Sequence, residues 1–188
     1  MYNTKGHEYQ EKEFVSKFLE PGIHQAKIKS IEYVKSQGGT EGMKIIHEGK
    51  PEVALNNEGK TADTTWWLSE AAWPSTKDKL TIMADKFKVR DQLDAINTDS
   101  AENYVEQAAK IFTGKIARWK FVGEEIKGKE GKQNWFKAKL SGFGFMEILD
   151  VSPSKLKFDP NNKYDMVRLP VAEVEFSSNG TTGEISPW

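Results

Sequence analysis

The chain lacks cysteine entirely and has only three histidines among its 188 residues. Disulfide frameworks, thiol nucleophiles and zinc ribbons are therefore excluded, and a reducing cytosol is permitted. His7, His24 and His47 do not have the spacing of metal ligands. We therefore expect a protein that uses no metal and no other cofactor.

Long hydrophobic runs and a strong charge of either sign are also lacking. No apolar stretch approaches the roughly 20 residues that a membrane-spanning helix needs, and the first residues lack the apolar core of a signal peptide. The 27 Lys and Arg residues nearly balance 28 Asp and Glu residues, and the net charge of −1 excludes a histone-like polycation. We expect a cytoplasmic protein in which any binding of anions depends on local sorting of charge.

The sequence does contain strand and helix patterns in a definite order. A glycine-rich turn separates the first two strand-like segments, which predicts a hairpin. The alternation slips near Ser30, which indicates a β-bulge. A helical periodicity begins after Pro74. Strands are expected at residues 23–34, 43–48, 64–68, 115–122 and 134–140, and helices at about 74–110.

Three strands, a helical insert and two further strands form the order of the OB-fold, a partly open five-stranded barrel. We therefore expect a mainly β (α+β) domain at residues 22–150, with helices between the third and fourth strands. Residues 1–21 have apolar side chains at helix-like spacing and are expected to form an N-terminal arm or a short helix. Residues 151–188 are expected to form an irregular extension with a mildly acidic tail.

The second expected hairpin is strongly basic. Residues 111–140 contain eight basic and three acidic residues, a local charge of +5 in a chain whose total is −1. Strand alternation separates a core face, which includes Trp119 and Phe121, from an outer face that carries cations and one Trp. A basic sheet face with an exposed aromatic suits single-stranded nucleic acid, although a solvated face with an incidental Trp is the simpler alternative. The outer face would carry Arg118, Lys120, Trp135, Lys137 and Lys139, and the loop would add Lys127, Lys129 and Lys132.

The first hairpin and third strand supply further candidates. Trp66 and Trp67 are neighbours on a strand, so one should be core and the other exposed. In an OB-fold, Tyr33 would lie at the mouth of the groove that the basic face forms, and Lys27 and Lys29 add positive charge nearby.

The C-terminus is a candidate docking peptide. Residues 171–188 contain three Glu and no Lys or Arg, and the chain ends in Pro187-Trp188. Such an end can insert its ring into a partner's pocket while its carboxylate meets a cation. An inert tail is the equally weighted alternative.

Enzymatic function has little support in the sequence. Residues 54–61 resemble a relaxed phosphate-binding loop, but a strand-like segment follows them where a helix is needed. The carboxylates of the helical insert lie among lysines, which is typical of a solvated face. We expect a protein that is not an enzyme.

Several segments of residue patterns resemble a known family. They are the opening strand with its glycine-rich turn (22–42), the strand and loop at 112–128, and the return strand at 134–138. On these patterns residues 22–149 resemble the OB-fold single-stranded DNA-binding proteins encoded by tailed bacteriophages. The end of the chain is similar to the acidic, Pro-Phe-terminated tails of bacterial single-stranded DNA-binding proteins, except that its acidic residues are sparse and its last residue is Trp.

The resemblance implies a protein that coats and protects single-stranded DNA, largely independently of sequence, in phage DNA replication, recombination and repair inside the bacterial host cell. It implies recruitment of replication or recombination proteins through Pro187-Trp188, and it allows a homo-oligomer. Trp135 would stack on a base, with Tyr33 and one of Trp66 or Trp67 as further platforms. The alternative is a virion structural or assembly protein, or a protein-docking OB-type module, whose basic face binds an acidic protein. Phosphates would be contacted by Lys27, Lys29, Arg118, Lys120, Lys127, Lys129, Lys132, Lys137 and Lys139.

Overall fold

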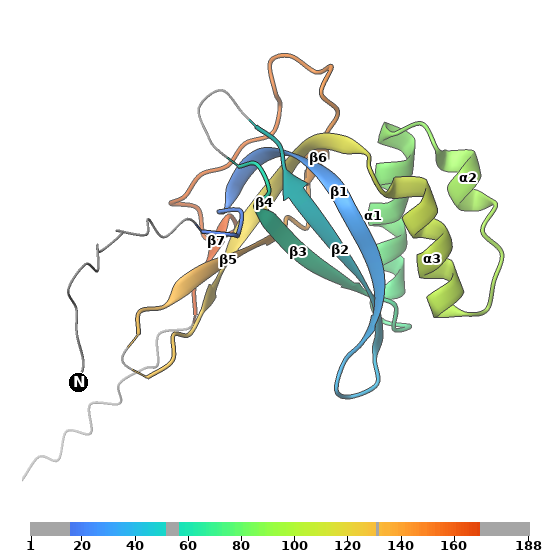
Figure 1. Cartoon of the computed structure of the whole chain (residues 1–188), viewed down its shortest axis with the longest axis horizontal. Coiled ribbons are helices and arrows are strands. Elements are labelled where there is room, and N and C mark those ends of the chain that lie inside the picture. Colours follow the sequence, from blue (N-terminus) through green and yellow to red (C-terminus); the bar gives the residue numbers. More distant parts are fainter. Residues whose placement is uncertain (1–15, 52–56, 131, 170–188) are drawn as a thin grey trace, which may run out of the picture.

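The computed structural model describes residues 16–51, 57–130 and 132–169. Within these ranges the protein is mainly β, with one seven-stranded and almost entirely antiparallel sheet and three helices (Figure 1). None of these helices is long and apolar enough to cross a membrane. The strands are β1 (Gly22–Lys35), β2 (Glu41–Gly49), β3 (Thr61–Trp67), β4 (Ile116–Ile126), β5 (Trp135–Leu140), β6 (Met146–Glu147) and β7 (Met166–Val167), and the helices are α1 (Trp73–Lys86), α2 (Arg90–Asp94) and α3 (Ala101–Phe112).

The main path of the sheet has the strand order β3-β2-β1-β4-β5. β1 pairs with β4 through its first half and with β2 through most of its length, so one long strand joins both halves of the sheet. Its register with β2 shifts between Ile28 and Ser30, which confirms the expected bulge. Bulges bend and twist a strand, and this one lets β1 curve between its two partners.

The two ends of this path approach each other without forming a ladder. In the described residues, β3 and β5 are joined by a hydrogen bond of 2.8 Å from the Leu140 amide to Thr64 Oγ1 and by an ion pair between Lys137 and Asp63. The prediction of a mainly β fold with helices is confirmed, and the sheet is open in the sense that no strand pairing closes it.

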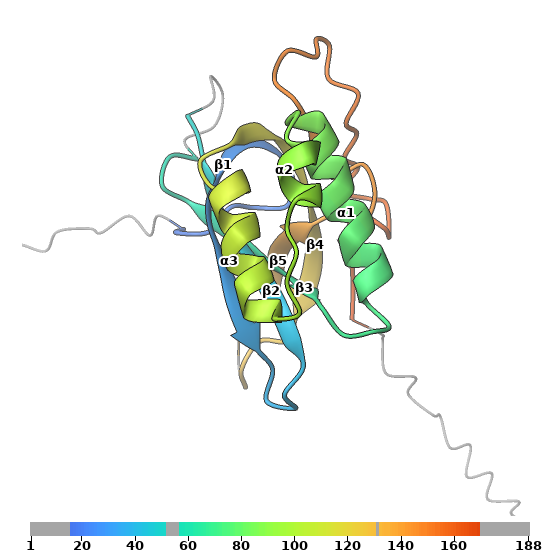
Figure 2. The same cartoon turned by 90° about the vertical axis from the view of Figure 1, so that its right-hand side faces the viewer.

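The helices lie between β3 and β4 in the chain and cover one end of the sheet (Figure 2). α3 begins where the Ser100 side chain accepts a hydrogen bond from the Asn103 amide, and it buries Val105, Ala108 and Phe112. Trp119 lies fully buried in the core, and its indole N–H donates to the carbonyl of Ala26 across the β1–β4 pair.

The segments that flank the sheet are anchored to it by backbone pairing and by buried side chains. Near the start of the described chain, Leu19 is buried, and Phe18 forms a parallel bridge with Thr61, so this part is extended and not helical. After β5, the chain lies along β4 through β6 and β7.

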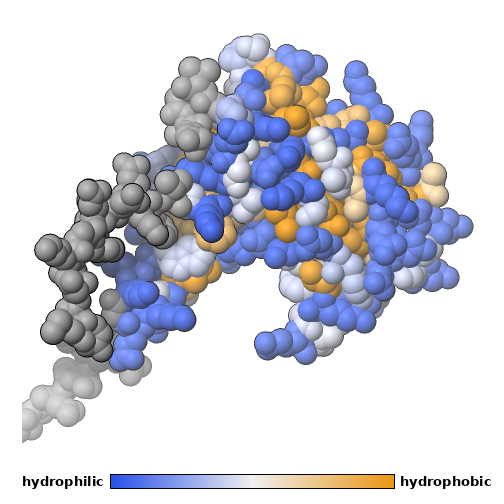
Figure 3. Space-filling model, in the orientation of Figure 1, coloured by the Kyte–Doolittle hydropathy of each residue, from blue (hydrophilic) through white to orange (hydrophobic). Residues whose placement is uncertain are grey.

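Hydrophilic residues dominate the face of the molecule in Figure 3, with hydrophobic ones visible mainly between sheet and helices.

Candidate functional site

Two hairpins project from the same side of the sheet, and β3 lies between them (Figure 1). One is the β1–β2 hairpin, which turns at residues 36–40, and the other is the β4–β5 hairpin, which turns at 127–134. The outline of the molecule is hollowed between the two (Figure 3). A flexible polymer chain could lie in such a hollow, in contact with the β-strands that line it.

Strand register decides which aromatic side chains face outward. Met43 pairs with Tyr33 on one side and Trp66 on the other, which places these three residues on the inner face. Trp67 pairs with Gly42, one position along, and therefore lies on the outer face. Trp66 is 5% exposed and Trp67 is 39% exposed, which confirms that one of the pair belongs to the core and the other does not.

Gly42 shapes the position of Trp67. A Cβ atom at Gly42 would lie 2.8 Å from Cε3 and 3.0 Å from Cζ3 of the Trp67 indole. The ring can lie against the β2 backbone because this position has no side chain. The sequence therefore builds a supported, half-exposed aromatic surface at the end of β3.

Trp135 provides the second outer aromatic. It pairs with Ile126 at the start of β5, is 49% exposed, and shares its strand face with Lys137. Lys137 is tied to Asp63, which lies four residues before Trp67 on β3. β3 and β5 run in the same direction. Trp67 lies four positions after Asp63 and Trp135 lies two positions before Lys137, so the two indoles are on the order of 20 Å apart along the strands at about 3.3 Å per residue.

Between the two indoles, Asp63 is shared by two lysines. Its Oδ2 lies 2.9 Å from Lys137 Nζ and 3.9 Å from Lys44 Nζ. The cluster therefore keeps a net charge of +1 on the outer face of β2, β3 and β5. We use "outer face" below for Lys44, Asp63, Thr65, Trp67, Trp135 and Lys137.

Glu48 is arranged in the same way at the other end of β2. It forms ion pairs with Lys27 and Lys29, and the hydrogen bonds from these two lysines, Lys27 first, hold the pKa of its carboxyl below the usual value. Here too one carboxylate is shared by two cations, which leaves one positive charge in excess.

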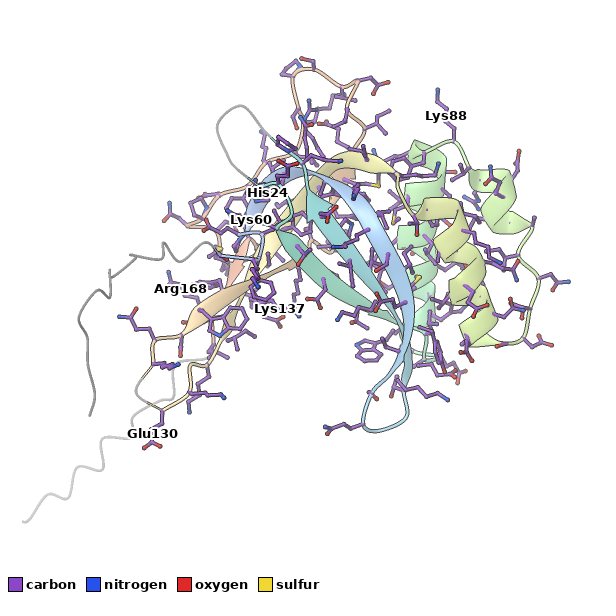
Figure 4. All side chains as sticks on the ribbon, in the orientation of Figure 1. His24, Lys60, Lys88, Glu130, Lys137 and Arg168 are labelled. Atoms are coloured by element: carbon purple, nitrogen blue, oxygen red, sulfur yellow. The ribbon has the colours of Figure 1, made fainter. Side chains whose placement is uncertain are left out.

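The hairpin loop is basic, because its three lysines outnumber Glu130 and give residues 127–132 a net charge of +2. Lys127, Lys129 and Lys132 are exposed, and none of the three forms an ion pair with another residue in the described ranges. The loop is held at its base, where Asn134 Oδ1 accepts a hydrogen bond from the Gly128 amide. Figure 4 shows Glu130 at the tip of this hairpin and Lys137 nearer the sheet.

Three other predicted phosphate contacts are engaged within the protein. Arg118 donates to Glu147 and to the carbonyl of Val151, and Lys120 pairs with Asp165. These two ion pairs are largely buried and fix the segment that follows β5 over β4. Lys139 pairs with Glu124 on the neighbouring strand at 2.8 Å. We therefore leave Arg118, Lys120 and Lys139 out of the candidate surface.

Tyr33 is also separated from the outer face. Its hydroxyl donates to Glu41 Oε1, and this hydrogen bond is the main reason that the pKa of Tyr33 is raised. Its ring packs against the hydrophobic core on the inner side of the sheet. Tyr33 and Trp67 thus do not line one surface, while Trp67, Trp135 and Lys137 do.

Phe18, an aromatic residue beside β3, was not among the candidates from the sequence. Phe18 is 62% exposed and lies beside Thr61 at the start of β3. Its exposure follows from the extended backbone, which alternates it with buried Leu19, whereas the apolar spacing favoured a helix. The other predicted contacts, Pro187 and Trp188, lie outside the described residues.

The described residues contain no cluster of His, Asp or Glu side chains that could hold a metal ion. A comparison with protein-family models finds none that matches the chain, and a search of curated proteins finds no significant match.

Proposed function

We propose that this chain is an OB-fold protein that binds and coats single-stranded DNA in a largely sequence-independent way and without catalysis, in the DNA replication, recombination and repair of a bacteriophage. The observation that carries the proposal is the outer face, where two half-exposed indoles flank a lysine cluster of net positive charge. Unstacked bases bind to flat aromatic faces, and phosphates bind to distributed cations.

The strand order supports the finer fold proposal. In the OB-fold a five-stranded sheet curls into a partly open barrel, and oligonucleotides bind across its second and third strands and the loops beside them. Here β2 and β3 carry Lys44, Asp63 and Trp67, the two hairpins flank them, and side-chain contacts link β3 to β5. A barrel of this kind would place all of these groups along one groove.

The charge distribution supports binding to a flexible polyanion. The two shared carboxylates each leave one lysine in excess, and the hairpin loop adds Lys127, Lys129 and Lys132. These cations are spread over two hairpins and are not gathered into a pocket for one phosphate. Spread cations favour a chain of phosphates over a single anionic ligand.

The direct test is a titration of the full-length protein with poly-dT, monitored by tryptophan fluorescence at two salt concentrations. We expect quenching, with an affinity that falls by about 0.7 log unit per log unit of salt for each phosphate contacted. Duplex DNA of the same length should bind far more weakly, because its bases are not free to stack. Unchanged emission with poly-dT in dilute buffer would contradict the proposal and would favour an acidic protein as the partner.

The Trp135→Ala variant tests the site itself. Because the indole is half exposed at the start of β5, its removal should weaken binding by about 1–3 kcal/mol and leave the fold intact. A lower melting temperature with unchanged affinity would show that Trp135 serves the fold and not the DNA.

A further inference from the structure

A groove of about 830 Å³ opens between the start of the described chain and β5. One wall is formed by residues 16–20, which run beside β3, where Leu19 N donates to the carbonyl of Thr61 and Thr61 N donates to the carbonyl of Lys17. The opposite wall is formed by residues 135–138, and residues 61–63 complete the lining. The volume lies within the range of about 300–1,000 Å³ that is typical of small-ligand sites.

Exposed aromatic rings stand on both walls of this groove. Leu19 is buried in the core, so the extended backbone turns the neighbouring Phe18 outward, where it is 62% exposed. Trp135 is 49% exposed on the other wall, and Phe136 lies beside it. Contiguous exposed apolar surface that lines a groove is typical of a ligand-binding site.

The polar groups of the groove suit an anionic backbone at its rim. Lys17 and Lys137 belong to the lining, one on each wall, and Asp63 is already shared by Lys44 and Lys137. Glu20 is the other carboxylate of the lining. Lys60 and Lys137 are labelled at the same end of the sheet in Figure 4.

We propose that this groove holds a nucleobase of the bound strand, stacked against Phe18 and Trp135, with Lys17 and Lys137 next to the flanking phosphates. The inference rests on the proposed function and deepens it, because it adds Phe18 as a contact from outside the main strands. Most of the exposed surface of the lining is apolar and includes aromatic faces, so a base would bind by stacking and the site should accept any base. It would extend the interface from Trp135 toward the start of the chain.

The test measures the affinity of full-length protein for a fluorescein-labelled dT oligomer and for an abasic oligomer of the same length. The variants are Phe18→Ala, Phe18→Leu and Phe18→Tyr. Leu keeps apolar bulk without a flat ring, while Tyr keeps the ring. The matched control is Phe143→Ala, because Phe143 is 92% exposed but lines a separate pocket beside α1 that shares no residue with this groove.

We expect Phe18→Ala and Phe18→Leu to weaken binding to the dT oligomer by about 5- to 150-fold, the range of one stacked base. Phe18→Tyr and Phe143→Ala should bind as the wild type does, and the abasic oligomer should bind equally to the wild type and Phe18→Ala. If Phe18→Ala fails to fold, the Leu and Tyr variants give the same answer, since both keep the bulk of the side chain.

Two results would overturn the inference while leaving the proposed function intact. They are full dT affinity in Phe18→Ala, and wild-type affinity in Phe18→Leu, which would indicate an apolar partner and not a stacked base. A wild-type protein that does not bind the dT oligomer at all would instead contradict the proposed function itself.

Discussion

Trp66 and Trp67 are adjacent in the chain and lie on opposite faces of β3, with Trp66 inside the core and Trp67 against Gly42 on the outer face. The pair therefore offers an internal comparison of one residue type in two environments. Trp66 also makes an edge contact with Phe145, with ring centroids 5.9 Å apart, which ties it to the core.

We expect the two Trp→Ala variants to have opposite effects. Trp66→Ala should lower the free energy of unfolding by about 3–5 kcal/mol, because it leaves a large cavity. Trp67→Ala should change stability little and weaken binding to a dT oligomer by about 1–3 kcal/mol. Urea unfolding and fluorescence anisotropy of a labelled oligomer measure the two quantities. Equal affinity of Trp67→Ala and the wild type would remove Trp67 from the interface.

The support that Gly42 gives to Trp67 leads to a second prediction. A Cβ atom at this position would overlap the indole, and it would also lie 3.1 Å from Thr65 Cγ2, so the ring must move. We expect Gly42→Ala to weaken binding of the dT oligomer by less than Trp67→Ala does, with little change in melting temperature. Gly38→Ala is the matched control, because the nearest atom to a Cβ there is 3.9 Å away. An equal effect of both variants would indicate a general response of the hairpin.

The loop lysines should control the salt dependence of binding. Replacing Lys127, Lys129 and Lys132 together by Gln should reduce the slope of log affinity against log salt by about 2, because each phosphate that a lysine neutralises contributes about 0.7 to that slope. The measurement is a set of anisotropy titrations between low and moderate salt.

The control for this triple variant makes the same charge change at the other end of the molecule. Lys77, Lys86 and Lys88 are exposed on and beside α1, and Lys88 is labelled at the helical end in Figure 4. Their replacement by Gln should leave the slope near that of the wild type. A similar drop in slope for both triples would show that net charge matters and the hairpin loop does not.

Much of the sheet could be predicted from the sequence, because local pattern determines it. Period-two alternation indicated the strands, the slip near Ser30 indicated the bulge, and the adjacent Trp66 and Trp67 had to face opposite ways. These features depend only on the alternation of side chains along a single strand, and residues that are neighbours in the sequence determine that alternation.

The charge partners could not be predicted in the same way. Arg118 and Lys120 have the alternation of an exposed basic face, yet Glu147 and Asp165 neutralise them from a segment without periodicity. Phe18 was missed for a related reason. Its apolar spacing with Leu19 suits a helix, but pairing with Thr61 imposes an extended backbone, so a tertiary contact overrides the local preference.

His47 should make the stability of the protein sensitive to acid. Its ring is fully buried between Trp119 and Phe121, at centroid distances of 4.5 and 5.4 Å, and neither ring nitrogen has a hydrogen-bond partner in the described residues. Burial lowers the pKa of His47 from 6.5 to about 3. Below pH 6.5 the unfolded chain binds a proton that the folded protein does not, so stability present at neutral pH is lost as the pH falls toward 3.

The expected loss from this group between pH 7 and pH 4.5 is about 2.5 kcal/mol, at about 1.4 kcal/mol per pH unit. His47→Leu removes the group, so urea unfolding at several pH values should show a flatter curve for the variant than for the wild type. Carboxylates with lowered pKa, such as Glu48 and Glu147, also lose their contribution in acid, but they do so in both proteins. Parallel curves for the two proteins would contradict the assignment.

Asp63 should restrain DNA binding, because it neutralises one of the two lysines that it contacts. Asp63→Asn keeps the shape of the side chain and releases Lys44 and Lys137, so the local charge rises from +1 to +2. We expect tighter binding of a dT oligomer at low salt and a slope against log salt that is steeper by about 0.7, as for one added phosphate contact. The loss of two partly exposed ion pairs should cost about 0.2–1 kcal/mol of stability each.

The control is Asp78→Asn on α1, which makes the same charge change away from the outer face and should leave the affinity and the salt slope unchanged. Weaker binding of Asp63→Asn would mean that the carboxylate positions Lys137 for the DNA. An equal gain in affinity in both variants would show that the net charge of the protein, and not the outer face, controls binding.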